Sequence, residues 1–181
     1  MKQKVLVVVD MQNDFIDGAL GTKEAEAIVP AVCEKIKIDA SEGALIFATM
    51  DTHPAIYLET REGRFLPVPH CIKGTDGWHI RPEVAEALED ARIIEKYSFG
   101  SLELPDAIAE ALQIKGISPK DAEIELVGLC TDICVVSNAL ILKARFPETD
   151  IRVDPGCCAG VTVEKHMAAL ETMRSCQIEV L

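Results

Sequence analysis

The stretch VGLCTDICVV, residues 127–136, decides the fold, because an apolar run typical of a strand passes there into a run typical of a helix. Cys130 and Cys134 stand four positions apart at this change. A strand that leads directly into a helix is the repeating unit of parallel sheets. The two cysteines could be a redox pair, metal ligands, two buried thiols, or a nucleophile and its neighbour, and the rest of the sequence bears on these alternatives.

Short runs rich in β-branched residues recur on both sides of this stretch. They lie at 5–9, 44–48, 93–94, 124–127, 151–153 and 178–180, and are almost continuously apolar, as expected for strands covered on both faces. Between them, apolar residues recur at helical spacing over 133–145 and 163–175, and Pro30, Pro82 and Pro105 stand where first-turn prolines would start helices. The alternation predicts an α/β fold, a three-layer α/β/α sandwich with a mainly parallel, roughly six-stranded sheet.

Length and charge limit the classes of function. The 181 residues fit one domain over residues 1–181, with enough core to fold without disulfides. The net charge of −12, with no basic cluster, argues against a nucleic-acid partner. The apolar run at the start is too short for a signal peptide, and no run suits a membrane span. Seven cysteines, an odd number, favour free thiols, so we expect a cytoplasmic protein without a membrane partner.

Polar side chains that can do chemistry follow four of the predicted strands. Asp10 follows the first strand, Asp51 the second, Lys96 the third, and the 130–134 segment the fourth. Parallel sheets bind ligands beyond the carboxyl ends of their strands, so we expect these groups to converge at one edge. The long segment 52–81 has little periodicity, which is typical of a functional loop.

Cys134 is the stronger candidate for a nucleophile. A thiol with a pKa near ~8.5 must lose its proton before it attacks, and a helix N-terminus together with the Lys96 ammonium would lower that pKa. The alternative is a small buried side chain, which we favour for Cys130. The CxxxC spacing is a poor signal for redox or zinc chemistry. We expect Cys33, Cys71 and Cys176 to serve packing, and Cys157 and Cys158 do not supply a second pair.

Asp10 and Lys96 together indicate acid–base chemistry. A carboxylate beside a lysine and a thiol can take the thiol proton and later give it to a leaving group. The alternative is an aspartate that caps the turn after its strand. The following MQNDF, residues 11–15, favours the catalytic reading, because polar Gln12, Asn13 and Asp14 surround Phe15 in what we interpret as a pocket wall.

A metal site is the third candidate. In DTH the carboxylate of Asp51 and the imidazole of His53 are two positions apart, so in an extended segment they share a face, and His70 could join them. This donor set suits Zn, Fe or Mn. Glu62 and Glu59 are candidate further ligands, while His79 and His166 are treated as bystanders. No glycine-rich phosphate loop follows a strand, so a nucleotide cofactor is not expected.

With these residues in view, the sequence resembles the isochorismatase-like cysteine hydrolases, and within them the nicotinamidase branch. The matching stretches are VVVDMQNDF (7–15), ATMDTH (48–53), LPVPHCIKGTDGW (66–78), EKYSFGS (95–101) and VGLCTDICV (127–135). The resemblance implies that Asp10 is the acid/base, Lys96 the cationic residue and Cys134 the nucleophile. It also implies a cis peptide bond between Leu129 and Cys130, and an oxyanion hole formed by the backbone N–H groups of Cys130 and Cys134.

The same resemblance implies a divalent metal, zinc before iron or manganese. Its ligands would be Asp51, His53 and His70, with Glu62 as the fourth and Glu59 as the less favoured alternative. The chain departs from the family at Pro67, where many nicotinamidases have an aromatic residue that stacks on the pyridine ring. Phe15 matches the other pocket wall, and Trp78 or Tyr97 would have to replace the missing one. Hydrolysis of an amide is thus better supported than nicotinamide itself.

We therefore expect a cysteine amidohydrolase that converts a small carboxamide, nicotinamide first, to the acid and ammonia through a thioester on Cys134. One alternative is a metal-independent hydrolase of an N-carbamoyl compound or an isochorismate-like ether. Another is a non-catalytic, thiol-sensing domain in which Cys130 and Cys134 form a reversible disulfide. Related proteins are often oligomers, so a homo-oligomer is also considered.

Overall fold

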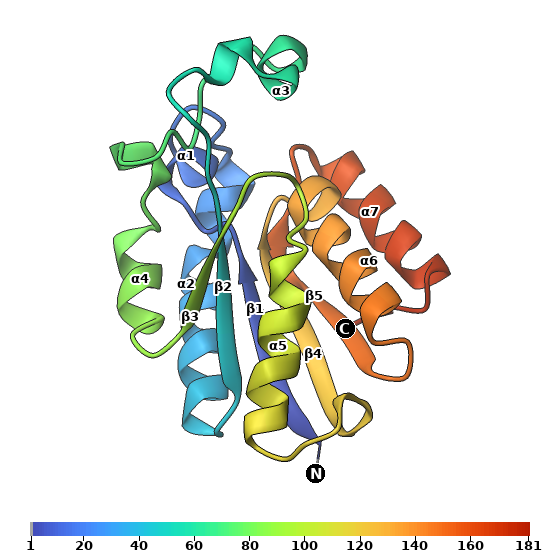
Figure 1. The fold of residues 1–181 in the computed structure, drawn as a ribbon. Coiled ribbons are helices and arrows are strands. Elements are labelled where there is room, and N and C mark those ends of the chain that lie inside the picture. Colours follow the sequence, from blue (N-terminus) through green and yellow to red (C-terminus); the bar gives the residue numbers. More distant parts are fainter. Residues whose placement is uncertain (1) are drawn as a thin grey trace.

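The computed structural model describes residues 2–181, and these form one sheet whose strands all pair in parallel (Figure 1). The six strands are β1 (Gln3–Val9), β2 (Leu45–Asp51), β3 (Arg92–Lys96), β4 (Ala122–Leu129), β5 (Asp150–Ala159) and β6 (Glu179–Val180), in the spatial order β3-β2-β1-β4-β5-β6. The predicted α/β sandwich is confirmed, and its sheet is parallel throughout.

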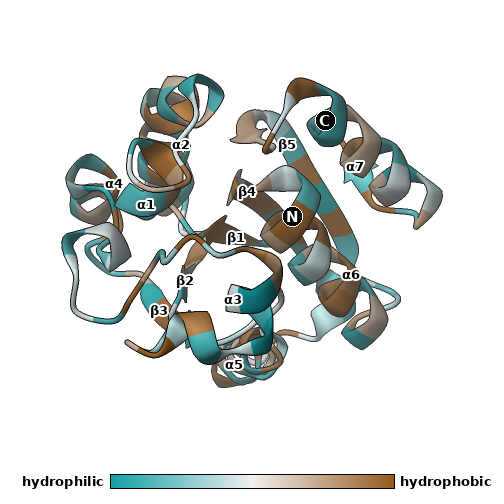
Figure 2. Cartoon of the chain, turned by 90° about the horizontal axis from the view of Figure 1, so that it is seen from above, coloured by the Kyte–Doolittle hydropathy of each residue, from teal (hydrophilic) through white to brown (hydrophobic). Residues whose placement is uncertain are grey.

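Helices cover both faces of this sheet. They are α1 (Asn13–Ile16), α2 (Lys23–Ser41), α3 (Arg61–Phe65), α4 (Pro82–Ala87), α5 (Glu103–Ile114), α6 (Val136–Arg145) and α7 (Val163–Ser175). The view from above shows α2 and α4 on one side of the sheet and α5 and α6 on the other (Figure 2). The predicted helix over 163–175 matches α7, whereas the one over 133–145 is a π-helical turn, Thr131–Val135, followed by α6.

The two faces of β1 enter two different cores. Val5, Val7 and Val9 pack in the cluster that α5, α6 and α7 complete, whereas Leu6 and Val8 pack in the cluster with α2 and α4. All five side chains are at most 1% exposed. A strand buried on both faces explains why this run is apolar without alternation.

Helix α2 begins earlier than the sequence predicts, so the expectation that Pro30 starts a helix is wrong. The Thr22 side chain caps the helix by accepting a hydrogen bond from the Ala25 N–H at 3.0 Å. Pro30 lies inside the helix on its exposed face, where solvent can bind the carbonyl that lacks an N–H partner. Pro82 and Pro105 do lie in first turns, those of α4 and α5.

The segment 52–81 rises above the carboxyl ends of the strands and carries α3 (Figure 1). Its Tyr57 is fully buried and donates a hydrogen bond to the Leu66 carbonyl at 2.9 Å. Gly63 packs so closely on the Tyr57 backbone that a Cβ would overlap it. The segment is therefore a packed loop at the edge where parallel sheets bind ligands. Within the residues that the structure describes, no helix has the length and apolar character needed to cross a membrane.

Candidate active site

Three of the predicted side chains meet around the ammonium of Lys96, itself the fourth. Its Nζ lies 2.7 Å from Asp10 Oδ2, 3.0 Å from Asp51 Oδ1 and 3.5 Å from Cys134 Sγ. Nζ also donates a hydrogen bond to the Ser98 carbonyl at 3.1 Å. Asp51 and Lys96 are the last residues of β2 and β3, whereas the sequence placed them just after these strands. The strand order thus brings all four side chains to one edge of the sheet.

Asp10 is held as a buried carboxylate directly after β1. Its backbone has a φ of 47°, in the left-handed region, and its Oδ1 accepts a hydrogen bond from Thr49 Oγ1 at 2.7 Å. Burial raises the pKa of the Asp10 carboxyl above its ordinary value, the Lys96 ammonium opposes this rise, and the Asp51 carboxylate adds to it. A carboxylate with a raised pKa is a better proton acceptor.

Cys134 lies in the π-helical turn Thr131–Val135 that connects β4 to α6. The Val135 N–H donates to the Cys130 carbonyl at 3.1 Å and closes this wide turn. The peptide bond between Leu129 and Cys130 is cis, as the family resemblance implies. The Cys134 side chain, 4% exposed, faces the buried groups around Lys96.

Burial raises the pKa of the Cys134 thiol well above its ordinary value, the Asp10 carboxylate adds to the rise, and the Lys96 ammonium only partly opposes it. The Lys96 ammonium lowers this pKa, as expected, but burial and the Asp10 carboxylate outweigh it, so the net shift is opposite to the one expected. The physical reason is that the thiol is buried and has a carboxylate beside it. At rest the thiol keeps its proton, and a base must remove that proton before the sulfur can attack.

A second cluster adjoins the first through Asp51. One donor atom from each of Asp51, His53, Glu62 and His70 lies within 4.8 Å of the others. Asp51 Oδ2 is 3.0 Å from His53 Nε2 and 3.7 Å from His70 Nε2, and Glu62 Oε1 is 3.6 Å from His53 Nε2. Two imidazoles and two carboxylates form a donor set that fits a divalent metal such as Zn, Fe or Mn. Glu59, the less favoured alternative in the sequence, is not a member of the cluster.

Neighbouring groups orient the two imidazoles. His70 Nδ1 lies 2.8 Å from the Val68 carbonyl, an arrangement that leaves Nε2 for the cluster. The Tyr57 ring meets His53 and His70 edge-on, with centroids 4.8 and 5.0 Å away. Burial opposes ionisation of Asp51, but the His53 hydrogen bond and the Lys96 ammonium hold its pKa below the ordinary value. Asp51 therefore stays ionised, as a metal ligand must.

Gln12 anchors the segment 52–81, a role that differs from the pocket wall that MQNDF suggested. Its fully buried amide accepts from the Asp51 N–H at 2.7 Å and donates to the Asp51 carbonyl at 2.8 Å and the Trp78 carbonyl at 2.7 Å. Asp14 accepts a hydrogen bond from the Cys71 N–H at 2.7 Å. The polar residues of MQNDF thus fix the loop that carries the second cluster.

Asn138 links the Cys134 turn to the loop after β3, and sequence reasoning missed it. Its side chain is fully buried, donates to the Cys134 carbonyl at 2.9 Å and accepts from the Ser101 N–H at 2.9 Å. A buried amide on a helix is expected to have such partners. The available signal was an asparagine on the apolar side of the predicted helix, four positions after Cys134.

The three predicted pocket aromatics occupy different places. Phe15 is buried with its ring centroid 5.5 Å from that of His70, beside the second cluster. Trp78 is half-buried and its Nε1 donates to Thr52 Oγ1 at 2.9 Å. Tyr97 is exposed and lines a cavity that also includes His53. Phe15 alone of the three contacts a candidate metal ligand through its ring.

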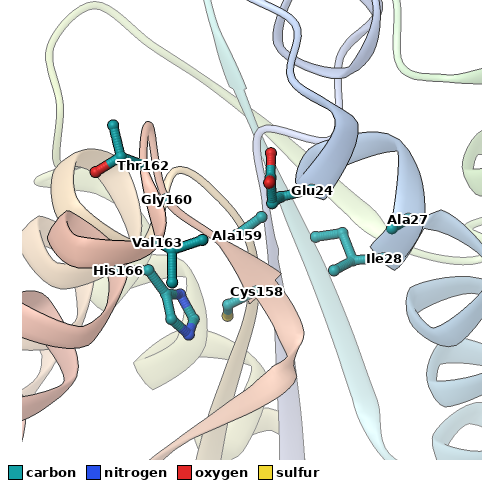
Figure 3. A pocket seen from close by; sticks show the side chains of 9 residues that line it. All are labelled: Glu24, Ala27, Ile28, Cys158, Ala159, Gly160, Thr162, Val163 and His166. Carbon is teal, nitrogen blue, oxygen red and sulfur yellow. The ribbon is translucent and has the colours of Figure 1, made fainter.

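A separate, mostly apolar cavity of about 270 Å³ lies between the N-terminal ends of α2 and α7 (Figure 3). His166, treated as a bystander in the sequence, lines it. His166 Nδ1 is 2.8 Å from the Oγ1 of Thr131, which belongs to the π-helical turn. His166 therefore supports the turn that carries Cys134.

The remaining cysteines are unpaired in the part of the chain that the structure covers. Cys71, Cys157 and Cys158 are buried and Cys33 is half-buried, as packing residues are. Cys176 is exposed at the end of α7, so the expectation that it serves packing is wrong. That helix ends one residue earlier, and the neighbouring Arg174, Ser175 and Gln177 are exposed as well.

The family model of the isochorismatase domain matches residues 4–181. The chain belongs to the isochorismatase family. This assignment agrees with the resemblance seen in the sequence, and the matched range covers nearly the whole chain.

Three relatives show how far the likeness extends. The chain is 32% identical to the zinc complex of the pyrazinamidase of Pyrococcus horikoshii, with a TM-score of 0.81 and coverage of 99% of this chain and 98% of that one. It is 27% identical over 189 residues to the nicotinamidase/pyrazinamidase of Mycobacterium tuberculosis, covering 98% of each. An N-carbamoylsarcosine amidase from Thermoplasma acidophilum is 26% identical with a TM-score of 0.75, covering 98% and 95%. The nicotinamidase-like branch of the isochorismatase family is thereby supported.

Proposed function

We propose that this isochorismatase-family protein is a cysteine amidohydrolase that converts nicotinamide, or a closely similar carboxamide, to the acid and ammonia. One observation carries the proposal: a thiol, a carboxylate and an ammonium are buried together around Lys96 Nζ, next to four side chains that can hold a metal. The relatives named nicotinamidase/pyrazinamidase and pyrazinamidase match 98% and 99% of the chain and support this substrate class.

The first proton transfer runs from Cys134 to Asp10. Burial and the Asp10 carboxylate hold Cys134 as a thiol at rest, and the raised pKa of Asp10 makes it a suitable base. When the sulfur loses its proton, the Lys96 ammonium, 3.5 Å from Sγ, stabilises the thiolate. Lys96 keeps its own proton, since burial alone would lower its pKa but Asp10 and the neighbouring anions raise it.

The thiolate then forms a bond to the carbonyl carbon of the amide. The backbone N–H groups of Cys130 and Cys134 stabilise the negative charge on the carbonyl oxygen. The carbon–nitrogen bond breaks, and the nitrogen takes the proton from Asp10 and leaves as ammonia. Water attacks the resulting thioester with Asp10 as base, and the proton returns to the sulfur as the acid is released. This sequence balances and restores Cys134 as a thiol.

Asp51, His53, His70 and Glu62 would hold the divalent metal, for which zinc is the first candidate and iron or manganese are alternatives. The solved zinc complex of the Pyrococcus horikoshii relative supports zinc. A bound divalent ion supplies positive charge that polarises a carbonyl group and acidifies water. Asp51 would bind the ion and also pairs with the Lys96 ammonium, so Asp51 connects the two clusters electrostatically.

A second candidate substrate is an N-carbamoyl compound. The likeness to the N-carbamoylsarcosine amidase favours it, and so does the exposed Pro67 at the position of the missing pyridine-stacking aromatic. A thiol-sensing role is less well supported, because burial raises the pKa of the Cys130 thiol to about 12, which leaves little of it as the reactive thiolate at neutral pH.

The test is an ammonia-release screen with nicotinamide, pyrazinamide and N-carbamoyl amino acids, each with and without a chelator. We expect ammonia from nicotinamide that the chelator diminishes. Cys134→Ala should abolish release, whereas Cys130→Ala should reduce it only mildly, because the proposed role of Cys130 is carried by its backbone. Ammonia release from N-carbamoyl amino acids alone, unaffected by the chelator, would replace the first candidate with the second.

A further inference from the structure

We propose that the site accepts carboxamides with an apolar, ring-sized extension, and that a cavity lined by aromatic side chains beside the metal cluster binds that extension. This inference rests on the proposed amide hydrolysis and specifies its substrate class. The cavity has a volume of about 680 Å³. An engineered cavity of about 150 Å³ is enough to bind benzene, and sites for drug-sized ligands span ~300–1,000 Å³. A single pyridine ring would thus leave most of the cavity unfilled.

The inner end of the cavity adjoins the reacting groups. His53 and Glu62, two members of the metal cluster, form part of its wall. Ser98 lines it too, and its carbonyl accepts the hydrogen bond from Lys96 Nζ, which lies 3.5 Å from Cys134 Sγ. A substrate whose carboxamide reaches Cys134 would therefore direct an extension past the cluster into this cavity.

The outer walls are suited to flat apolar groups. Phe65 is 77% exposed, Tyr97 71% and Phe99 49%, and all three line the same cavity. The Arg61 guanidinium lies over the Phe65 ring, with Cζ 5.3 Å from the ring centroid, and extends this surface. Several solvent-exposed aromatic side chains around one cavity are typical of a binding site. They offer faces and edges against which a further ring can pack.

The narrow two-aromatic clamp expected for a lone pyridine ring is incomplete here. Pro67 is exposed, and Trp78 is committed to its hydrogen bond with Thr52 and is not part of the cavity wall. Phe15 contacts the cluster from the buried side. The aromatic surface lies instead farther out, at Phe65, Tyr97 and Phe99, as a longer substrate would require.

The test compares nicotinamide with nicotinamides that carry a phenyl group at C5 or C6. Ammonia release gives kcat/KM for each, and calorimetry gives the affinity of each for the Cys134→Ala protein, which cannot turn them over. We expect at least one phenyl derivative to exceed nicotinamide by about tenfold in kcat/KM and in affinity, as burial of an extra ring implies.

Two variants connect that preference to the cavity. Phe65→Ala and Phe99→Ala should each lower the ratio of phenyl derivative to nicotinamide by about threefold to tenfold, the scale of one aromatic contact. Both side chains are exposed, so neither change threatens the fold. Ile114→Ala is the matched control: Ile114 is 81% exposed at the end of α5, away from the cavity, and its loss should leave the ratio unchanged.

The outcomes separate this inference from the proposed function. If no amide releases ammonia, the proposed function fails. If nicotinamide is hydrolysed but no phenyl derivative is preferred, or if the preference survives both phenylalanine variants, the inference fails while the function stands. If light scattering shows that Phe65→Ala changes the oligomeric state and leaves the ratio intact, the aromatic surface is a contact between copies and the inference is again overturned.

Discussion

Replacing Thr49 by valine removes one hydrogen bond from the proposed base and keeps the shape of the side chain. The bond joins Thr49 Oγ1 to Asp10 Oδ1 at 2.7 Å, and both side chains are fully buried. A hydrogen bond to a charged group contributes about 1.5–3 kcal/mol, and each 1.36 kcal/mol of such a preference corresponds to about one pKa unit. Thr49→Val should therefore raise the pKa of Asp10 by about one to two units.

The direction of the effect follows from which form of Asp10 works. The base must be ionised, so kcat/KM falls as the pH drops through the pKa of Asp10, which burial already raises above its ordinary value. Loss of the Thr49 donor moves this acid limb to higher pH. The value of kcat/KM on the plateau at still higher pH stays unchanged. The free energy of unfolding falls at pH values above the raised pKa, where Asp10 is ionised, and this loss shrinks as the pH drops through that pKa.

The assay is the pH profile of kcat/KM for ammonia release, with Thr149→Val as the matched control. Thr149 is also buried and donates one hydrogen bond, to the Pro119 carbonyl at 2.8 Å, but it lies just before β5 at the opposite edge of the sheet. The Thr149→Val protein should be less stable than the parent protein, but the acid limb of its kcat/KM profile should not shift. An acid limb that stays in place in Thr49→Val would refute Asp10 as the base.

Three further changes test other parts of the site. Glu62→Gln should weaken zinc binding by about tenfold or more, measured by competition with a chelator dye. Glu59→Gln should leave the zinc affinity unchanged. Equal zinc affinities of the two variants would show that Glu62 is not a ligand. Asn138→Leu should lower kcat more than KM because it frees the Cys134 carbonyl and the loop after β3, and an unchanged kcat would leave Asn138 a packing residue. Gly63→Ala should lower the thermal midpoint, because its Cβ would overlap the Tyr57 backbone, and an unchanged midpoint would show that the loop can shift.

The layered fold and the position of the site could be predicted because they depend on local patterns. The run 5–9 is apolar on both faces, the pattern expected where helices cover a strand on both sides. The convergence of Asp10, Asp51 and Lys96 then follows from parallel strand order, since Asp51 and Lys96 end their strands and Asp10 directly follows β1, all at the same edge.

Features that depend on long-range contacts were not predictable in this way. The start of α2 depended on the Thr22 cap, which outweighs the preference of Pro30 for a first turn. The pKa of Cys134 depended on how completely the fold encloses it, which a helix-terminus argument ignores. Gln12 and Asn138 act by binding backbone atoms of Asp51 and of distant loops, and no spacing in the sequence reveals such partners.

The central claim is that Cys134 carries the acyl group between amide and acid. The most direct measurement is to mix the protein with nicotinamide, quench in acid during turnover, and locate any acyl adduct by peptide mass spectrometry. The predicted result is a nicotinoyl adduct on the peptide that contains Cys134. In Cys134→Ala, both the adduct and ammonia release should be absent. Ammonia release that persists in Cys134→Ala, or turnover with the adduct on another residue, would contradict it.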